Sequence, residues 1–391
     1  MSGGPLAGIR VVDLTTVVVG PTATLFLADY GADVIKVESP GGDLLRTLGG
    51  RSKSGQLSGK FTHFNRNKRS IVLDLKQKKA MEALHKLLET ADVFIANIRP
   101  AALERLGLGT EALRTRHKRL IVCNLMGFGR DGRYAERPAY DSIIQGMSGV
   151  AACNARIFGE PKFVPMVMMD HTVGLIATQC ILAALFHREK TGEGQAIEVP
   201  MFENAASFVL VEHMGDHTFV PPLGDWGDRR VLDPLAQPIA TKDGWICVSA
   251  NTDGQAFALF DAIGRPELKT DPKFNSVKAR YANVREYFSI RAEGLKQKTS
   301  AEWLDILEKA DVPVMPMHDL ESLLEDPHMV TTGVFPVVDH PTEGRIRSMT
   351  PSARWSETKV EPSRLAPRLG EHSEAILREA GFSTEEIAAM V

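Results

Sequence analysis

The chain has 391 residues, of which 43% are hydrophobic and 24% are charged, and its formal net charge is −3. Such a length is enough for two domains with a sizeable core, and the composition is that of an ordinary globular enzyme. The nearly balanced charge gives no electrostatic reason to expect a nucleic acid or an acidic membrane as a partner.

The cysteines and the apolar stretches indicate the compartment. Cys123, Cys153, Cys180 and Cys247 form no CxxC pair and lie in apolar stretches, which favours free thiols in a reducing cytoplasm. No stretch reaches the roughly 20 apolar residues that span a bilayer. Residues 1–5 lack the basic and apolar regions of a secretory signal, so we expect a cytoplasmic protein without a membrane partner.

A strand–helix–strand unit opens the chain. Residues 9–14 are predicted to form a short buried strand, and Pro21 suits the first position of a helix expected over 22–30. Gly31 follows as a stop signal, and residues 34–38 form the second strand. This order of elements predicts a parallel α/β sheet.

The alternation of strands and helices continues and then changes after about residue 225. Further strands are expected at 70–75, 92–96 and 120–124, with a helix over 80–88. The later segment is predicted to contain a strand at 244–250 and amphipathic helices over 255–264, 285–297 and 300–309. This change of pattern indicates a smaller α+β domain. Strands at 334–338 and 344–348 and a helix over 373–380 are expected near the end.

Asp170 is the most informative single residue. It lies between the apolar run 165–169 and an apolar helix expected over 175–186, and burying a lone charge there would be costly unless it is paired, capping or functional. Aspartate is a favoured residue at a helix N-terminus. The positive end of the helix dipole also favours an ionised carboxylate, which a nucleophile must be. Position alone therefore leaves capping and catalysis both open.

Three other segments could bind a nucleotide-like ligand. Residues 17–21 stand where a dinucleotide-binding protein carries GxGxxG, but the glycines are missing, so a bound NAD is not expected. Residues 65–69 place three cations before a strand, as a solvated face or as a phosphate anchor. Arg99 and Arg105 flank a short apolar segment. The histidines show no metal-ligand spacing and there is no GxSxG motif, so we expect neither a metal site nor an α/β-hydrolase.

Short segments spread along the whole chain carry a resemblance to a known family. They are 6–14, 31–38, 65–71, 91–97, 140–149, 170–174, 191–195, 326–328 and 369–372. Each is weak alone, but in this order they resemble the family III CoA-transferases, also called the CaiB–BaiF family. The resemblance implies a large Rossmann-like α/β domain with a parallel sheet, formed by residues 1–224 and 331–391. A small α+β domain, residues 225–330, is inserted into it, and two chains interlock as a homodimer.

The resemblance also implies an activity and a set of site residues. Asp170 is expected to attack the thioester of an acyl-CoA, giving a mixed anhydride and then an aspartyl-CoA thioester that an acceptor carboxylic acid consumes. Coenzyme A is thus a substrate, and no permanently bound cofactor is implied. Asp141 and Gln145, with Tyr140, are expected to line the acyl pocket. The expected coenzyme A contacts are Val18, Val19, Ser39, Leu73, Lys76, Asn97, Ile98, Arg99, Arg105 and the loop 138–141, with the 65–69 cations as further phosphate or carboxylate ligands.

Some positions depart from the family pattern. Thr16 stands where a family member has a histidine, Ser39 where it has an arginine, and the glycine-rich lid is reduced to residues 224–228. The identity of donor and acceptor therefore stays open, although the cations favour dicarboxylates.

Two alternative functions share this fold. An α-methylacyl-CoA racemase needs an acid and a base flanking the α-carbon, and Tyr140 occupies the position of the histidine that racemases use. Tyrosine, with an ordinary pKa of about 10, is a poor general base at neutral pH, which favours the transferase. A coenzyme A-binding protein without catalysis is disfavoured by the presence of Asp170 with Asp141 and Gln145.

Overall fold

The computed structural model describes residues 3–360 and 364–390, which form two compact units. Unit 1 consists of Met1–Ser148, Val164–Ser207 and Pro327–Val391, and unit 2 of Gly149–Phe163 and Phe208–Asp326. The sequence predicts the small domain at residues 225–330. Its C-terminal boundary lies close to the end of unit 2 at Asp326, whereas the main segment of unit 2 begins earlier than expected, at Phe208. Residues 149–163 belong to unit 2 although they lie far from its other residues in sequence, and long-range contacts of this kind leave no mark in local composition.

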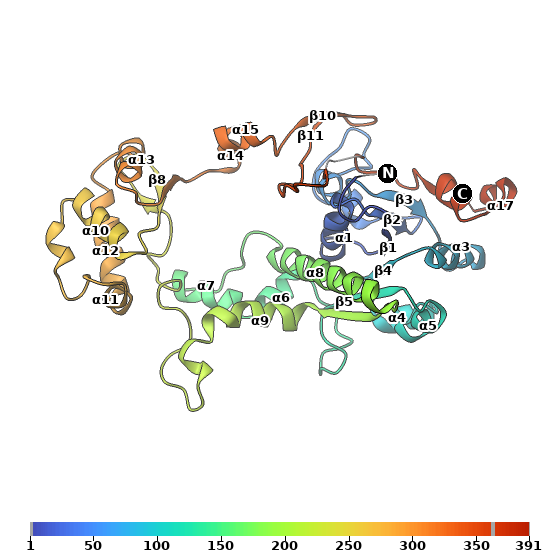
Figure 1. Cartoon of the computed structure of the whole chain (residues 1–391), viewed down its shortest axis with the longest axis horizontal. Helices are drawn as coiled ribbons and strands as arrows, with labels where there is room; N and C mark the ends of the chain where they lie inside the picture. The colour runs from blue at the N-terminus through green and yellow to red at the C-terminus, as the bar shows by residue number, and fades with distance from the viewer. Residues whose placement is uncertain (1–2, 361–363, 391) are drawn as a thin grey trace. The chain divides into compact units, whose positions relative to one another are not determined.

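Unit 1 is built on a six-stranded parallel sheet, as the alternation of strands and helices predicted (Figure 1). Its strand order is β3-β2-β1-β4-β5-β6, which is the order of a doubly wound nucleotide-binding fold. The strands are β1 (Arg10–Leu14), β2 (Asp33–Glu38), β3 (Arg69–Val72), β4 (Val93–Ala96), β5 (Ile121–Met126) and β6 (Ala196–Pro200). The strand order reverses between β1 and β4, so a crevice at their carboxyl ends is the expected ligand site.

Helices cover both faces of this sheet. The helices of unit 1 before α8 are α1 (Val19–Asp29), α2 (Gly59–Phe64), α3 (Lys78–Glu89), α4 (Pro100–Arg105), α5 (Thr110–Arg116) and α6 (Asp141–Met147). The C-terminal segment adds α15 (Pro327–Thr332), the hairpin β10 (Val337–His340) and β11 (Gly344–Arg347), α16 (Ser373–Glu379) and α17 (Thr384–Ala388). Apolar residues of α3, α5 and α16 pack with the sheet in one buried cluster that includes Leu84, Leu113 and Ile376. The C-terminal tail therefore belongs to the same core as the N-terminal strands.

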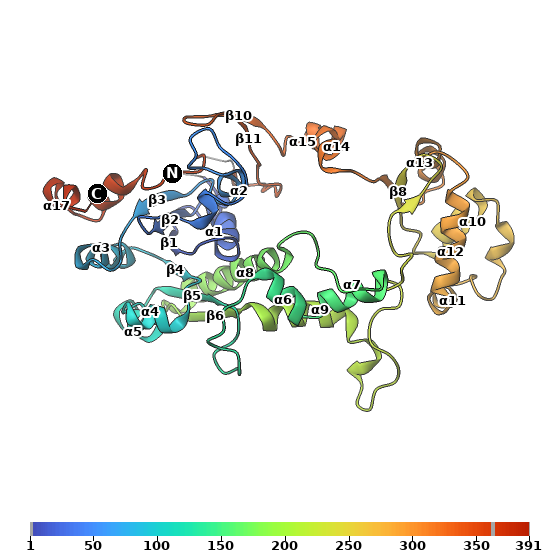
Figure 2. The ribbon, with the colours of Figure 1, turned by 180° about the vertical axis from the view of Figure 1, so that it is seen from behind.

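The long helix α8 (Met168–Thr191) packs on α1 (Figures 1 and 2). Asp170 lies in the first turn of α8. By length and composition α8 could cross a membrane, whereas the sequence predicted no segment of this kind. Half of its most apolar part is buried in the fold. Burial of this kind is typical of a core helix. Thr178 Oγ1 on α8 donates to the carbonyl of Ala23 on α1 at 3.3 Å, so the two backbones lie close together.

Unit 2 combines helices with a three-stranded antiparallel sheet (Figure 2). The sheet has the order β7 (Ile239–Ala240), β8 (Trp245–Val248), β9 (Val314–Pro316). The helices are α7 (Val150–Phe158), α10 (Asp253–Ala262), α11 (Val277–Ala282), α12 (Val284–Leu295), α13 (Ser300–Lys309) and α14 (Leu320–Glu325), while α9 (Met201–His213) runs across the boundary at Ser207. Trp303 is fully buried in the core and donates its indole N–H to the carbonyl of Leu295 at 2.7 Å.

Gly174 allows the close approach of α8 to α1. A Cβ atom at Gly174 would stand 2.7 Å from Thr22 Cβ and 2.8 Å from the Val19 carbonyl oxygen. We expect Gly174→Ala to lower the stability of the protein by roughly 1–3 kcal/mol, because overpacking at a rigid contact outweighs the better helix propensity of alanine. Thermal unfolding measures this. Gly59→Ala, in α2 of the same unit with only ordinary contacts around it, is the matched control, and equal stability of the two variants would contradict the prediction.

Candidate active site

A pocket of about 270 Å³ lies in unit 1 at the carboxyl ends of β1 and β4. The turn after β1, the residues after β4, the end of β5 with its loop, and the first turn of α8 all contribute to its walls. The lining residues are Thr16, Val17, Val18, Val19, Asn97, Arg99, Pro100, Leu125, Met126, Gly127, Ala135, Arg137, Pro138, Ala139, Tyr140, Asp170 and Met201. The pocket thus occupies the point where the strand order of the sheet reverses.

The turn between β1 and α1 is held by hydrogen bonds from three directions. Asn97 accepts the backbone N–H of Thr16 at 3.1 Å and donates its amide to the Thr16 carbonyl at 2.8 Å. Asp13 accepts the N–H of Thr15 at 2.9 Å, and Asp43 accepts that of Val17 at 3.1 Å. Val17 itself has a φ of 68°, which costs free energy for a β-branched residue and persists only where the surroundings impose it.

Buried charged side chains bind to this turn and fix its conformation. Lys36 and Lys68 are both fully buried, and Lys36 Nζ lies 2.9 Å from Asp43 and donates to the Thr15 carbonyl at 2.9 Å. Lys68 Nζ lies 3.3 Å from Asp13. Burial alone would raise the pKa of Asp13, but Lys68 and Lys36 outweigh it and hold that pKa below the ordinary value. Burial, with the like charge of Lys36, lowers the pKa of Lys68 to about 8 despite the nearby Asp13.

Asp170 is the third residue of α8 and does not cap it. The helix begins at Met168, earlier than the sequence pattern indicated, and Val167 before it makes no side-chain cap. The Asp141 carboxylate accepts hydrogen bonds from the backbone N–H groups of Met169 and Asp170 at 2.7 and 3.1 Å, so these two groups of the first turn of α8 are paired. The capping role that the sequence left open for Asp170 is therefore filled by Asp141, which is distant in sequence.

Burial raises the pKa of Asp170 to about 7, and the nearby carboxylate of Asp141 adds to the rise. The positive end of the helix dipole acts in the opposite direction, since it favours the ionised form. Burial is the stronger influence here, so Asp170 exchanges its proton near neutral pH. A carboxyl group of this kind in a cleft is a candidate functional group.

Asp141 and Gln145 form a buried network behind Asp170. Gln145 donates its amide to Asp141 at 2.6 Å and to the Met166 carbonyl at 3.0 Å, and its side-chain oxygen accepts the N–H of Val164 at 2.9 Å. Neither residue is among those that line the pocket. The structure therefore gives them a positioning role for α8, whereas the sequence expectation placed them in the wall of the acyl pocket.

The other expected site residues fall into two groups. Five of them line the pocket together with Asp170: Val18, Val19, Asn97, Arg99 and Tyr140. Ser39, Leu73, Lys76, Ile98 and Arg105 are not among its lining residues. Ser39 and Leu73 directly follow β2 and β3 at the same edge of the sheet, but Leu73 is buried in the core and Ile98 packs against it. Lys76 and Arg105 are exposed.

The cations at 65–69 have internal partners, which corrects the expectation of a phosphate anchor. Arg66 pairs with Asp29 at 2.5 Å, and Arg69 pairs with Asp33 at 2.6 Å and with Glu379 at 2.8 Å. Together with Lys68, these side chains are buried. Their charges hold β3 and α16 to the rest of unit 1, and local sequence could not reveal this because the acidic partners lie far along the chain.

Arg137 is a lining residue that sequence reasoning missed. It stands one residue before the loop 138–141 that the family resemblance named, and its guanidinium lies 5.0 Å from the Tyr134 ring. No periodicity or spacing distinguished it from the neighbouring arginines. In the described ranges 3–360 and 364–390, neither Arg137 nor Arg99 forms an ion pair, and no cluster of metal-ligating side chains was found in them.

Comparisons with known proteins agree on one family. Residues 6–373 match the model of CoA-transferase family III. The chain is 32% identical to the succinyl-CoA:glutarate CoA-transferase of Homo sapiens over 96% of this chain and 86% of that protein. It is 34% identical to the formyl-CoA:oxalate CoA-transferase of Rhodopseudomonas palustris over 98% of this chain and 95% of that protein. A crystal structure of a CaiB/BaiF family protein from Brucella suis covers 97% of this chain, and this chain covers all of it, with a TM-score of 0.81 and 31% identity.

The raised pKa of Asp170 has a consequence for stability that needs no substrate. The folded pKa of about 7 lies above the unfolded value of 3.8, so stability is lost as the pH rises from about 4 through 7. At about 1.36 kcal/mol per pKa unit the loss is up to roughly 4 kcal/mol. We expect Asp170→Asn to be more stable than the wild type at about pH 8 by roughly 2–4 kcal/mol, and the gain to shrink toward about pH 4.

Thermal unfolding of both proteins across this pH range measures the effect. Asp131→Asn, which changes an exposed aspartate of the same unit, is the control and should show no such pH-dependent difference. An Asp170→Asn variant with the same stability difference at both ends of the range would rule out an elevated pKa.

Proposed function

The chain belongs to CoA-transferase family III, and on that premise we propose that it moves coenzyme A between carboxylic acids with Asp170 as the nucleophile. The main support for this proposal is the location of the Asp170 side chain. It lies in a pocket at the carboxyl end of a doubly wound sheet, in the first turn of α8, with its pKa raised to about 7.

The proposed reaction conserves the energy of the thioester in four exchanges. The Asp170 carboxylate attacks the acyl carbonyl of the donor, forming an anhydride and releasing the coenzyme A thiolate. The thiolate attacks the aspartyl carbonyl, which gives an aspartyl-CoA thioester and frees the donor acid. The acceptor carboxylate then attacks that thioester and forms a second anhydride with release of thiolate. Attack of the thiolate on the acceptor carbonyl yields the new acyl-CoA and restores Asp170.

Residues around Asp170 suit the supporting tasks. Asn97 holds the turn that contains Val17 and Val18, so the backbone of this turn is a fixed surface beside the nucleophile. Asp141 holds the first turn of α8 and thereby the orientation of Asp170. A nucleophile whose pKa is near the working pH is ionised for a large part of the time, yet it keeps more reactivity than a strongly acidic carboxyl group.

We infer that the transferred acids include dicarboxylates. Arg99 and Arg137 both line the pocket, and a guanidinium binds a carboxylate through two parallel hydrogen bonds. One of them could hold the second carboxyl group of a substrate while the other binds a phosphate of coenzyme A. The relatives named above act on succinyl-CoA, glutarate and oxalate by their names, which supports this choice.

An α-methylacyl-CoA racemase is the alternative function for this fold. A racemase would need a second acid–base group opposite Asp170. Tyr140 occupies the position where racemases have a histidine, and it is 68% exposed. No hydrogen bond orients the Tyr140 hydroxyl within the described part of the chain. These observations favour the transferase.

We also propose that the protein acts in the cytoplasm as a homodimer. Its four cysteines are free, which suits a reducing compartment. Large apolar side chains are exposed on unit 2, among them Phe208, Val211, Phe219 and Leu223, and such groups often lie in interfaces between subunits. Light scattering behind a sizing column gives the oligomeric state in solution.

The nucleophile can be identified by trapping. After incubation with succinyl-CoA and then hydroxylamine, we expect intact-protein mass spectrometry to show a covalent adduct, the hydroxamate, that peptide mapping places on Asp170. Asp170→Asn should lose the adduct and turnover, because an amide is no carboxylate nucleophile. Asp141→Asn keeps an oxygen that can accept the N–H groups of α8 and should keep the adduct.

Two results would contradict this proposal. An adduct that persists in Asp170→Asn would move the nucleophile elsewhere. The absence of any adduct, combined with exchange of the α-proton of a 2-methylacyl-CoA for deuterium, would establish the racemase instead. A panel of free acids then tests the substrate class, since transfer from succinyl-CoA to monocarboxylates alone would exclude the dicarboxylate preference.

The pH dependence follows from the same carboxyl group. We expect kcat/KM for the acyl-CoA to rise about tenfold per pH unit below about pH 7 and to level off above it, because only ionised Asp170 attacks. In Asp141→Asn the rise should move to lower pH, since one of the two causes of the raised pKa is removed. Initial rates across the pH range measure both, and a profile that is flat from about pH 5.5 to 8.5 would argue against Asp170.

A further inference from the structure

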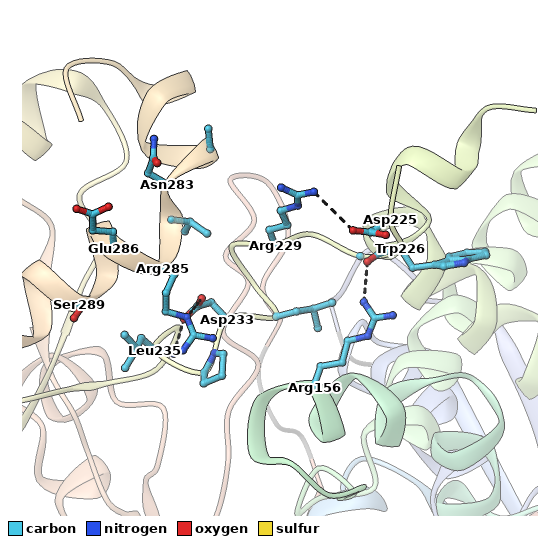
Figure 3. Close-up of a pocket in the computed structure, with 15 residues that line it drawn as sticks. Arg156, Asp225, Trp226, Arg229, Asp233, Leu235, Asn283, Arg285, Glu286 and Ser289 are labelled. Atoms are coloured by element: carbon cyan, nitrogen blue, oxygen red, sulfur yellow. Dashed lines mark hydrogen bonds and ion pairs between the residues drawn. The ribbon is translucent and has the colours of Figure 1, made fainter. Parts of the chain in front are cut away.

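Unit 2 contains two cavities lined by arginines, and they differ in charge balance. One, of about 1050 Å³, lies between the segment 225–235 and residues 282–289 (Figure 3). Its arginines have local partners: Arg285 pairs with Asp233 at 2.7 Å, and Arg229 lies 3.8 Å from Asp225. Arg156 donates to the Trp226 carbonyl at 2.8 Å. This cavity has as many carboxylates as arginines in its wall, so the wall carries no excess of positive charge.

The second cavity, of about 440 Å³, is lined by three arginines and no acidic residue. It lies between the end of β8 and the helices α11 and α12. The lining residues are Arg230, Val231, Ala236, Gln237, Val248, Ser249, Ala250, Asn251, Val277, Arg280, Tyr281, Val284, Tyr287, Phe288 and Arg291. Its wall is therefore cationic and apolar at once.

Two of the three arginines have carboxylate neighbours outside the cavity wall. Arg280 pairs with Asp253 at 2.8 Å and donates to the Phe274 carbonyl at 2.9 Å. Arg230 lies 3.7 Å from Asp228. These two side chains are thus partly neutralised, and they add positive potential to the cavity without being its main anion ligand.

Arg291 is the arginine that lacks a counter-charge. Its side chain is only 9% exposed, and its guanidinium lies 4.7 Å from the Phe288 ring and 5.5 Å from the Tyr287 ring. One Nη donates to the Val248 carbonyl at 3.0 Å, but Nε has no hydrogen-bond partner. Among the residues that the structure describes, no carboxylate pairs with it. A buried charge is costly unless it is paired, and burial accordingly lowers the pKa of Arg291.

We propose that this cavity binds an organic carboxylate with an aromatic or branched apolar body, whose carboxylate group pairs with Arg291. The carboxylate of such a ligand supplies the missing counter-charge and accepts a hydrogen bond from Arg291 Nε. Its apolar body would contact Val277, Val284 and Tyr281 in the same wall. This site shares no residue with the pocket of Asp170, and the proposal holds whether or not Asp170 is the nucleophile.

Calorimetric titration of the full-length protein with benzoate tests the site. We expect one site per chain in the wild type and at least a tenfold weaker affinity in Arg291→Gln, because the paired charge is lost. Arg285→Gln is the matched control, since it changes an exposed arginine of the same helix that lines the other cavity, and it should leave the affinity unchanged. Benzamide, which has the same ring without the charge, should not bind.

A second pair of variants covers the case in which Arg291→Gln does not fold. Val277 is 51% exposed at the start of α11 and lines the cavity, so it tolerates polar substitutions. We expect Val277→Glu to weaken benzoate binding at least tenfold and Val277→Lys to keep or strengthen it, because the two side chains differ mainly in the sign of their charge.

Several outcomes would overturn the proposal. Wild-type protein that does not bind benzoate, or binding that is unaffected by both Arg291→Gln and Val277→Glu, would exclude the site, and the second result would place any bound benzoate elsewhere. Equal affinity for benzamide would make the charge irrelevant. Equal affinity for inorganic phosphate would show that the apolar wall contributes nothing, and the proposed class of ligand would be wrong.

Discussion

The buried charges that hold the turn after β1 are the constraint on which the pocket of Asp170 depends. Lys36 and Lys68 are fully buried, and each reaches both a carboxylate and a backbone carbonyl of the turn region. Removing one partner of a buried pair costs about 3–5 kcal/mol, because the other charge is left unpaired. The turn is therefore held in one conformation, including the unfavourable φ of Val17, and it offers a rigid surface beside Asp170.

The position of Asp170 shows why reactivity and stability conflict at this site. A carboxyl group that is largely buried and close to Asp141 is less stable as an anion than in the unfolded chain. In the proposed reaction the same surroundings would make the ionised carboxylate a stronger nucleophile, since fewer water molecules solvate its charge. The N–H groups that Asp141 binds keep the first turn of α8 intact. The fold thus accepts an unfavourable residue because neighbouring interactions fix the helix around it.

Sequence patterns predicted the parts of this protein that are determined locally. The strand β4 is a continuous apolar run, as expected for a parallel sheet buried on both faces, whereas buried charged residues (Asp13, Lys36 and Glu38) interrupt the apolar runs of β1 and β2. Long-range interactions could not be predicted in this way. Three features all join residues far apart in the chain: the ion pairs of Arg66 and Arg69, the packing of residues 149–163 with the rest of unit 2, and the capping of α8 by Asp141. Val18, Asn97 and Tyr140, which the family resemblance named as site residues, line the same pocket as Asp170, but the resemblance could not distinguish lining residues from residues that only follow a strand.

The arginines of this chain illustrate the same limit in a form that bears on function. Arg66 and Arg69 stand in a basic cluster that suggests anion binding, yet their carboxylate partners leave no charge for a ligand. Arg291 lies in an amphipathic helix where the sequence pattern gives no sign of anion binding, yet it is buried without a counter-charge. What decides whether an arginine can bind an anion is the balance of charge around it in the folded state. By that criterion Arg99, Arg137 and Arg291 are the candidates for anion binding, whereas the clustered cations of residues 65–69 are not.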